Sequence, residues 1–129
     1  MTELRVESGS PYEERYGFVR GLRQGSRVEI AGTAPIPEPG RAVADTAFAQ
    51  MLRCGEIVAG ALEQLGSSCD DVVRTRMYIT DAADADEVGR AHGELFGAAR
   101  PVATMVVVAA LLDPAWKVEL EVEAIATSP

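Results

Sequence analysis

Residues 117–126 read KVELEVEAIA, and this stretch decides the fold class of the chain. Its apolar side chains occupy alternate positions, as Val118, Leu120, Val122 and Ala124. Its carboxylates occupy the positions between them, as Glu119, Glu121 and Glu123. An alternation of period two is typical of a β-strand that has one apolar and one polar face. We therefore expect this strand to lie in a sheet that is covered on one face.

Two further strands are predicted upstream of this stretch. Residues 103–112 contain the continuous apolar run TMVVVAALL, which is typical of a central strand buried on both faces. Residues 72–79 are rich in β-branched side chains. Their alternation puts Arg74 and Arg76 on one face, opposite a second set of side chains: Val73, Thr75, Met77 and Ile79.

Two helices are predicted between the strands. Residues 42–65 carry apolar side chains at helical spacing, and Gly66 follows them as a C-terminal cap. Thr80 or Asp81 would cap a second helix over residues 83–96. The buried stripe of this second helix is expected to be Val88, Ala91, His92, Leu95 and Phe96.

The N-terminal part of the chain predicts a hairpin and a loop. Residues 18–23 and 27–31 read as two short strands, and residues 35–40 (PIPEPG) contain too many prolines for a helix or strand. Residues 1–16 are polar and predict an irregular arm. The element order is then β-β-α-β-α-β-β, an α+β fold in which residues 1–129 form one domain with long helices on one face of a mixed sheet.

Composition restricts the function classes. The 129 residues include 12 basic and 20 acidic side chains, and the resulting net charge of −8 disfavours nucleic acid as a partner. We expect free thiols at Cys54 and Cys69, no metal and no cofactor, because the chain has no zinc-binding spacing, phosphate loop or dinucleotide fingerprint. Residues 1–20 contain no continuous apolar run, so we expect a cytoplasmic protein without a membrane partner.

A sheet with helices on only one side leaves its other face uncovered. A monomer of this kind would expose a large apolar patch, which predicts a homo-oligomer.

Four strings in this order resemble the RidA/YjgF family, whose older label is endoribonuclease L-PSP. The strings are residues 17–25 (GFVRGLRQG) followed by 31–34 (AGTA), residues 71–81 (DVVRTRMYITD), residues 100–111 (RPVATMVVVAAL) and residues 118–126 (VELEVEAIA). The resemblance implies a YjgF/chorismate mutase-like fold and a homotrimer with small-molecule clefts between subunits. In its deaminase branch, the family hydrolyses 2-imino acids to 2-keto acids and ammonia without a cofactor.

The family's cleft residues carry over only in part. The deaminase glutamate corresponds to Glu121, but the arginine that clamps the substrate carboxylate corresponds to Ala103. The tyrosine, serine and asparagine positions correspond to Phe18, Ala31 and Gly89. An alanine cannot make the paired charge-assisted hydrogen bonds of a guanidinium, so the resemblance is to an arginine-lacking branch.

Further candidates for substrate binding surround these positions. Gly32 and Thr33 form the turn whose backbone contacts the ligand in the family. Arg100 lies three residues before Ala103, about 10 Å along a strand, and should not simply replace the missing arginine. Arg20 and Thr104 complete the set of candidate substrate-binding residues.

Two residues are candidates for catalysis, and each has a structural alternative. Glu121 either lies on a solvated or interface face or positions and deprotonates a water. At least one of the three glutamates of residues 117–126 should meet a cation, water or a ligand, because three jointly buried carboxylates repel one another. His92 either packs in the core or an interface or acts as a general acid–base group near the cleft.

The function expected from these observations is that of a Rid-family trimer that hydrolyses an imine or enamine with a diverged substrate specificity. The alternative is a non-enzymatic trimer that binds a metabolite or regulates another protein. Ribonuclease activity is disfavoured, because the charge is wrong and a single histidine without a cluster of cations is a poor phosphoryl-transfer site.

Overall fold

The strand formed by residues 118–125 lies in the middle of a mixed sheet. The computed structural model describes residues 3–129 and contains six strands in the spatial order β1-β2-β3-β6-β4-β5. Their bounds are β1 Glu3–Val6, β2 Gly21–Gln24, β3 Arg27–Thr33, β4 Val72–Ile79, β5 Val102–Val107 and β6 Val118–Ile125. All neighbouring pairs are antiparallel except β4 and β5, which are parallel.

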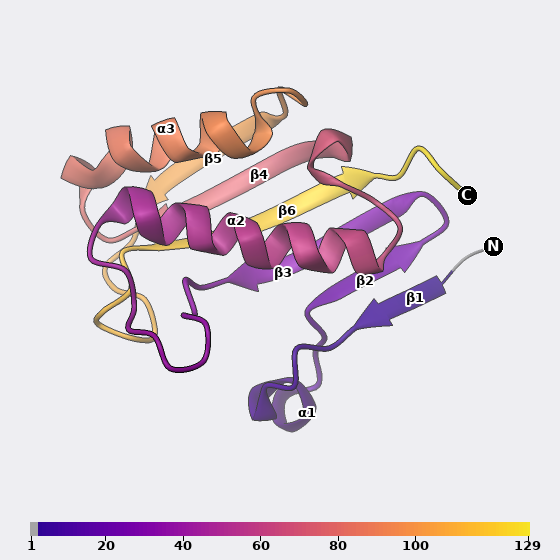
Figure 1. Cartoon of the computed structure of the whole chain (residues 1–129), viewed down its shortest axis with the longest axis horizontal. Helices are drawn as coiled ribbons and strands as arrows, with labels where there is room; N and C mark the ends of the chain where they lie inside the picture. The colour runs from indigo at the N-terminus through magenta and orange to yellow at the C-terminus, as the bar shows by residue number, and fades with distance from the viewer. Residues whose placement is uncertain (1–2) are drawn as a thin grey trace.

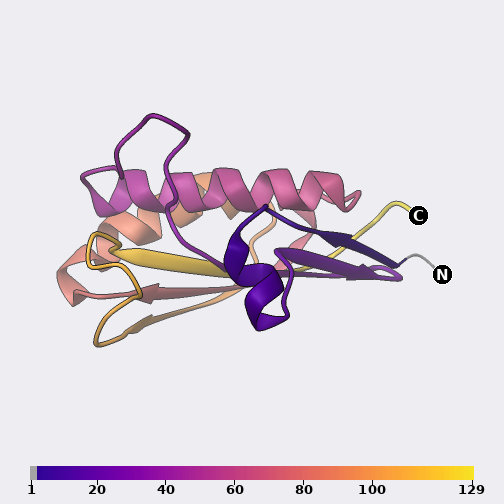
Figure 2. The ribbon, with the colours of Figure 1, turned by 90° about the horizontal axis from the view of Figure 1, so that it is seen from below.

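Two long helices, α2 (Ala47–Gln64) and α3 (Ala85–Phe96), lie side by side on one face of this sheet (Figures 1 and 2). The predicted α+β class and the one-sided helical layer are therefore confirmed. The apolar side chains of β6 are buried beneath the helices as predicted: Val118, Leu120, Val122 and Ala124. No helix within residues 3–129 is long and apolar enough to cross a membrane.

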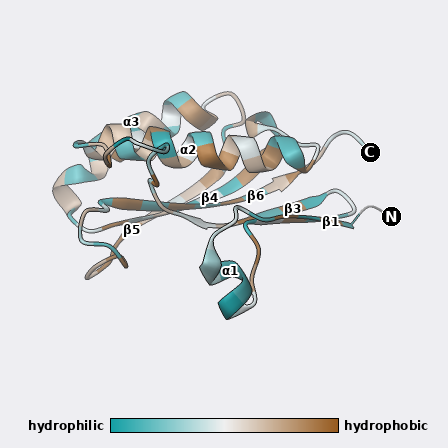
Figure 3. Cartoon of the chain, turned by 60° about the horizontal axis from the view of Figure 1, so that its bottom comes forward, coloured by the Kyte–Doolittle hydropathy of each residue, from teal (hydrophilic) through white to brown (hydrophobic). Residues whose placement is uncertain are grey.

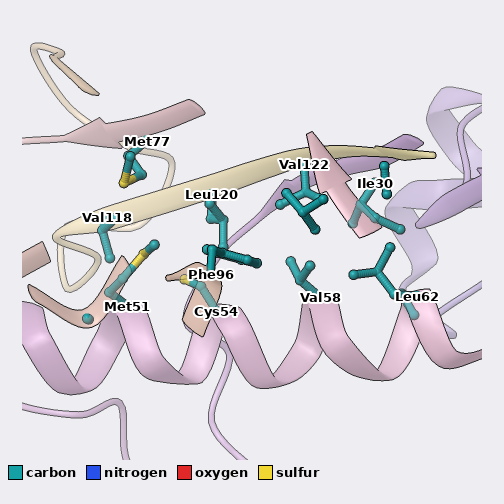
Figure 4. Close-up of a cluster of buried hydrophobic side chains, with 14 of the residues drawn as sticks. Ile30, Met51, Cys54, Val58, Leu62, Met77, Phe96, Val118, Leu120 and Val122 are labelled. Carbon is teal, nitrogen blue, oxygen red and sulfur yellow. The ribbon is translucent and has the colours of Figure 1, made fainter. Parts of the chain in front are cut away.

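The core lies between α2 and the sheet. Apolar side chains of α2 point toward β3 and β6 (Figure 4): Met51, Cys54, Val58 and Leu62 toward Ile30, Leu120 and Val122. Fully burying a side chain of this size contributes about 1.5–3 kcal/mol to stability. Cys54 and Cys69 are free thiols as predicted, and burial raises the pKa of the Cys54 thiol to about 12, so it is an inert packing residue.

Local capping sets the ends of the helices. Helix α2 begins at Ala47 rather than at the predicted residue 42, because the Thr46 hydroxyl accepts a hydrogen bond from the Ala49 N–H at 3.1 Å. Gly66 follows the helix with φ +75° and closes it as predicted. The Asp81 side chain caps a 3₁₀ turn, Ala82–Asp84, that leads into α3, so the second helix also begins slightly later than predicted.

A β-bulge changes the faces of β4. Val72 pairs with Ala124, whereas Arg74 pairs with Glu123, so one extra residue stands in β4. As a result Val72 is buried and Val73 is 44% exposed, and the prediction that Val73 shares the buried face is wrong. The other three side chains of that face are buried as predicted: Thr75, Met77 and Ile79.

Strand β5 lies at the edge of the sheet. The prediction of a central strand over residues 103–112 is wrong, because β6 occupies the place between β3 and β4 and leaves β5 with β4 as its single neighbour. The strand ends at Val107, and residues 108–112 leave the sheet. Valines of β5 are exposed in the single chain: Val102, Val106 and Val107.

The N-terminal segment is regular rather than an irregular arm. Strand β1 pairs with β2, and residues Pro11–Tyr16 form helix α1, which Ser10 caps through the N–H of Tyr12. The residues of the predicted arm before Glu3 lie outside the described part of the chain. Helix α1 lies on the side of the sheet opposite α2 and α3 (Figure 3). Strand β2 begins only at Gly21, so Phe18 lies in the connection between α1 and β2.

Candidate functional site

The sheet face opposite α2 and α3, here called the open face, carries the polar side chains of β6 and β4. Strand pairing sets them in three rows across β6, β4 and β5: Glu123–Arg74–Val102, Glu121–Arg76–Thr104 and Glu119–Tyr78–Val106. The apolar residues that alternate with them in β6 face the helices, so the period-two pattern of the sequence directly produces this polar surface.

Glu121 is held by two side chains of β4. The Tyr78 hydroxyl donates a hydrogen bond to its Oε1, and the Arg76 guanidinium lies 3.8 Å from its Oε2. Arg76 also donates to the Glu123 carboxylate at 2.9 Å. The hydrogen bond to Glu121 raises the pKa of the Tyr78 phenol, with a smaller contribution from burial. The prediction that at least one glutamate of β6 meets a cation is confirmed.

Glu119 has a different environment. Its carboxylate lies over Gly32, where a Cβ atom would come within 2.5 Å of the Glu119 Oε2 atom, so a side chain at position 32 would require the Glu119 carboxylate to move. Burial raises the pKa of Glu119, with a small addition from Glu121, and the attraction of Arg20 offsets only part of this. Within residues 3–129 no side chain pairs with the Glu119 carboxylate at hydrogen-bond or ion-pair distance.

The Arg20 side chain is hydrogen-bonded to the end of β3 beside Glu119. Its Nη2 donates to the Gly32 carbonyl at 2.8 Å, while its Nε is buried without a protein partner among the described residues. Burial lowers the pKa of the Arg20 guanidinium, although Glu13 and Glu119 oppose that shift. Of the candidates for substrate binding, Arg20 and Gly32 thus lie beside Glu119, and Thr104 lies in the same row as Glu121.

His92 lies on the other side of the sheet from Glu121. Its Nε2 is 2.7 Å from the Oγ1 of buried Thr75, which faces the helices, and its ring is 5.2 Å from that of Phe96. Burial lowers the pKa of the imidazole. Within one chain the sheet separates His92 from Glu121, and the contacts with Thr75 and Phe96 match the packing alternative for His92.

Two other candidates also lie away from Glu121. Ala103 pairs with Thr75 and so shares the helix-covered side of the sheet. Gly89 lies on the exposed surface of α3, where an added Cβ would meet open space.

The remaining candidates lie in connections or at the end of a strand. Phe18 is 41% exposed, and Arg100 is exposed with φ +50° just before β5. Thr33 is buried, and its hydroxyl donates to the Ala31 carbonyl at 2.8 Å. Gly32 and Thr33 thus lie at the end of β3 rather than in a turn after it, and neither Phe18 nor Arg100 contacts Glu121.

The open face is not a closed cavity in the single chain. Two shallow hollows lie at loops, one beside Arg53 and one beside Trp116, and Glu121 lines neither of them. Within the described residues, no three histidine, cysteine or carboxylate side chains come together as metal ligands.

Sequence reasoning missed Tyr78 as a site residue. The alternation of residues 72–79 does put Tyr78 on the same face as Arg76, and that signal was available. The contact with Glu121 could not be predicted from the sequence, because the Tyr78 side chain passes its register partner Glu119 and bonds to the next open-face carboxylate of β6.

Comparisons with known proteins agree with this fold. Residues 10–127 match the Endoribonuclease L-PSP family. An uncharacterized protein of Streptomyces coelicolor is 38% identical over 120 residues, which cover 93% of this chain and 90% of that protein. The 2-iminobutanoate/2-iminopropanoate deaminase of Salmonella typhimurium is 31% identical over 112 residues, which cover 84% of this chain and 85% of the deaminase.

A solved structure supports the same assignment. The crystal structure of a YjgF/YER057c/UK114 family member from Mycobacterium tuberculosis superimposes with a TM-score of 0.87 at 38% identity and covers 97% of this chain and 100% of that one. The family match spans nearly the whole chain, and the structural match covers 97% of it. The chain therefore belongs to the Endoribonuclease L-PSP family, which is also named after RidA and YjgF.

Proposed function

We propose that this chain forms a homotrimer in which open faces of neighbouring subunits enclose small-molecule clefts. The open face carries exposed valines at the ends of its rows, Val102 and Val106, and edge strand β5 has one side free of a strand partner within the described chain. Covering such a surface is favourable by about 25 cal/mol per Å² of apolar area. The three-fold symmetry rests on the family resemblance.

The cleft would hydrolyse a small imine or enamine. The observation that carries this proposal is Glu121, a half-buried carboxylate held by Tyr78 and Arg76 on the face that the trimer would enclose. The relationship to a 2-iminobutanoate/2-iminopropanoate deaminase supports the reaction class. No cofactor takes part in the proposed reaction.

Glu121 would act as the general base in this reaction. It takes a proton from water as the water oxygen bonds to the iminium carbon, which gives a neutral carbinolamine. It then returns that proton to the nitrogen. As the C–N bond breaks, Glu121 takes the hydroxyl proton, the carbonyl product forms, and the released ammonia takes up that proton and leaves as ammonium. Both atoms and charge balance without an oxidant or reductant.

The substrate specificity would differ from that of the deaminase branch. Ala103 stands where the resemblance implies the arginine that clamps a substrate carboxylate. Arg76 and Arg74 lie against Glu123, and Nη2 of Arg20 donates to the Gly32 carbonyl while its Nε has no protein partner among the described residues, so each guanidinium is at least partly engaged within the chain. We therefore assign the chain to an arginine-lacking branch and expect an imine without a carboxylate to be preferred over a 2-imino acid.

The alanine at position 103 also favours a second function. Such a trimer could bind a neutral metabolite without any chemistry, as a regulatory protein. Ligand-dependent thermal stabilisation without product formation would identify such a binding module.

The testing experiment measures ammonia release from freshly generated 2-iminopropanoate and from a simple aliphatic imine without a carboxylate, each corrected for spontaneous hydrolysis. We expect acceleration by the wild-type chain, larger for the simple imine. Glu121→Gln should lower the rate by about 10²-fold or more, which is typical of a lost general base. Glu63→Gln removes an exposed carboxylate of α2, on the other side of the sheet, and serves as the matched control with an unchanged rate. A folded oligomer without activity on either substrate would contradict the enzymatic proposal.

A further inference from the structure

The sequence pattern did not predict the contact between Tyr78 and Glu121. Pairing sets Tyr78 opposite Glu119 and Arg76 opposite Glu121. Both side chains nevertheless reach past their register partners to the next open-face glutamate of β6, so that Tyr78 donates to Glu121 and Arg76 donates to Glu123. As a result each carboxylate oxygen of Glu121 has one contact: the phenol on Oε1 and the guanidinium at 3.8 Å from Oε2.

The phenol contact matters because Glu121 is surrounded mainly by other carboxylates. From its own strand it faces the like charges of Glu119 and Glu123, and from β3 it faces Glu29, which pairs with Glu123. From β4 it faces Arg76 and Tyr78. Arg76 lies closer to Glu123 than to Glu121, so the phenol is the one direct hydrogen bond that Glu121 receives among the described side chains.

We propose that Tyr78 is a positioning residue of the cleft, which orients the Glu121 carboxylate through a hydrogen bond to Oε1. A hydrogen bond from a hydroxyl to a carboxylate is charge-assisted and fixes the direction of the group. Tyr78 then orients one oxygen, and Oε2, 3.8 Å from the Arg76 guanidinium, is the oxygen left to take a proton from water. This inference rests on the proposed hydrolase function for its catalytic meaning, but the hydrogen bond can be tested without catalysis.

Tyr78 can act as a constant donor in this pair. The contact with Glu121 raises the pKa of its phenol further above the ordinary value of about 10, so the hydroxyl keeps its proton at neutral and moderately alkaline pH. Loss of that proton would set a phenolate directly against a carboxylate. Tyr78 therefore orients Glu121 and takes no part in proton transfer with the substrate.

The test uses Tyr78→Phe, which removes the hydroxyl and keeps the ring. Carboxyl carbons are observed by NMR at neutral pH in chains labelled with ¹³C-glutamate, and the signal of Glu121 is assigned by its loss in Glu121→Gln. We expect the chemical shift of the Glu121 carboxyl carbon to change in Tyr78→Phe, because that carboxylate loses its hydrogen-bond donor. Tyr16→Phe on exposed α1 is the matched control and should leave that signal unchanged.

Kinetics supply the second measurement. In Tyr78→Phe kcat should fall about tenfold, the usual worth of a hydrogen bond to a charged group, with a smaller change in KM. A wild-type chain without imine hydrolysis would overturn the proposed function while the NMR signal still decides the contact. An unchanged Glu121 signal in folded Tyr78→Phe would overturn the inference about Tyr78.

Discussion

Glu119 and Glu121 show how two carboxylates of one strand come to differ. They are two residues apart, about 7 Å along β6, and they point to the same face. Glu121 receives the hydroxyl of Tyr78, whereas Glu119 lies over the bare backbone of Gly32. Two neighbouring carboxylates in environments as different as these are typical of acid–base sites.

Glu119 should make stability depend on pH. Burial raises its pKa in the folded chain, so above the ordinary glutamate value of about 4.3 the native state binds more protons than the unfolded state. Stability is therefore lost as pH rises through the raised pKa, and the cost persists at neutral pH.

Glu119→Gln should accordingly raise the melting temperature at pH 7 and have no such effect below about pH 4, where both states of the wild-type carboxyl are protonated. Thermal unfolding at matched protein concentration measures this difference. Equal melting temperatures of variant and wild type across that range would show that Glu119 carries no burial penalty.

At the scale of the elements, α2 and α3 approach closely because of a glycine. A Cβ atom at Gly55 of α2 would lie 2.4 Å from the terminal carbons of Leu95 and 2.9 Å from its Cγ. Gly60 lies on the same helix with open space around it. The two glycines therefore allow a test of packing in which the chemical change is identical.

Gly55→Ala should destabilise the chain by about 1–3 kcal/mol, because the methyl group forces Leu95 or α3 to move. Gly60→Ala should stabilise it by about 0.5–1 kcal/mol, because alanine is the better helix former and meets nothing. Urea unfolding of both variants gives the two free energies. A neutral or stabilising Gly55→Ala would show that α3 is free to shift on α2.

At the scale of the whole molecule, helices cover only one face of the sheet, so the core lies on that side and the open face lies on the other. Strand β5 shows the consequence, since its apolar run is exposed in a single chain although its composition is that of a buried strand. An edge strand of this kind is a template for association. The proposed trimer would bury it against another copy.

Val106→Lys should lower the molar mass of the particle in solution from that of the proposed trimer toward that of the monomer, because it sets a charge in the surface that would be covered. Ile36→Lys, at a comparably exposed aliphatic position in the loop after β3, should leave the mass unchanged. Light scattering after size-exclusion chromatography measures both. A wild-type chain that is monomeric at micromolar concentration would contradict the trimer.

The sequence by itself determined the fold class, the faces of β6 and the main helices. These features follow from local periodicity, since side chains two apart in a strand share a face and those three or four apart in a helix share a stripe. Gly66 closed α2 where predicted for the same reason, because the cap depends on a few neighbouring residues.

Only the tertiary structure decided the place of β5 at the edge, the contact of Tyr78 with Glu121 and the separation of His92 from the open face. Each depends on which strands become neighbours and in what register, and no local pattern encodes that choice. An apolar run such as that of β5 reads the same whether its own chain or another copy covers it. The candidate site was therefore predicted at Glu121 and completed only by strand pairing, which set Tyr78 and Arg76 beside it.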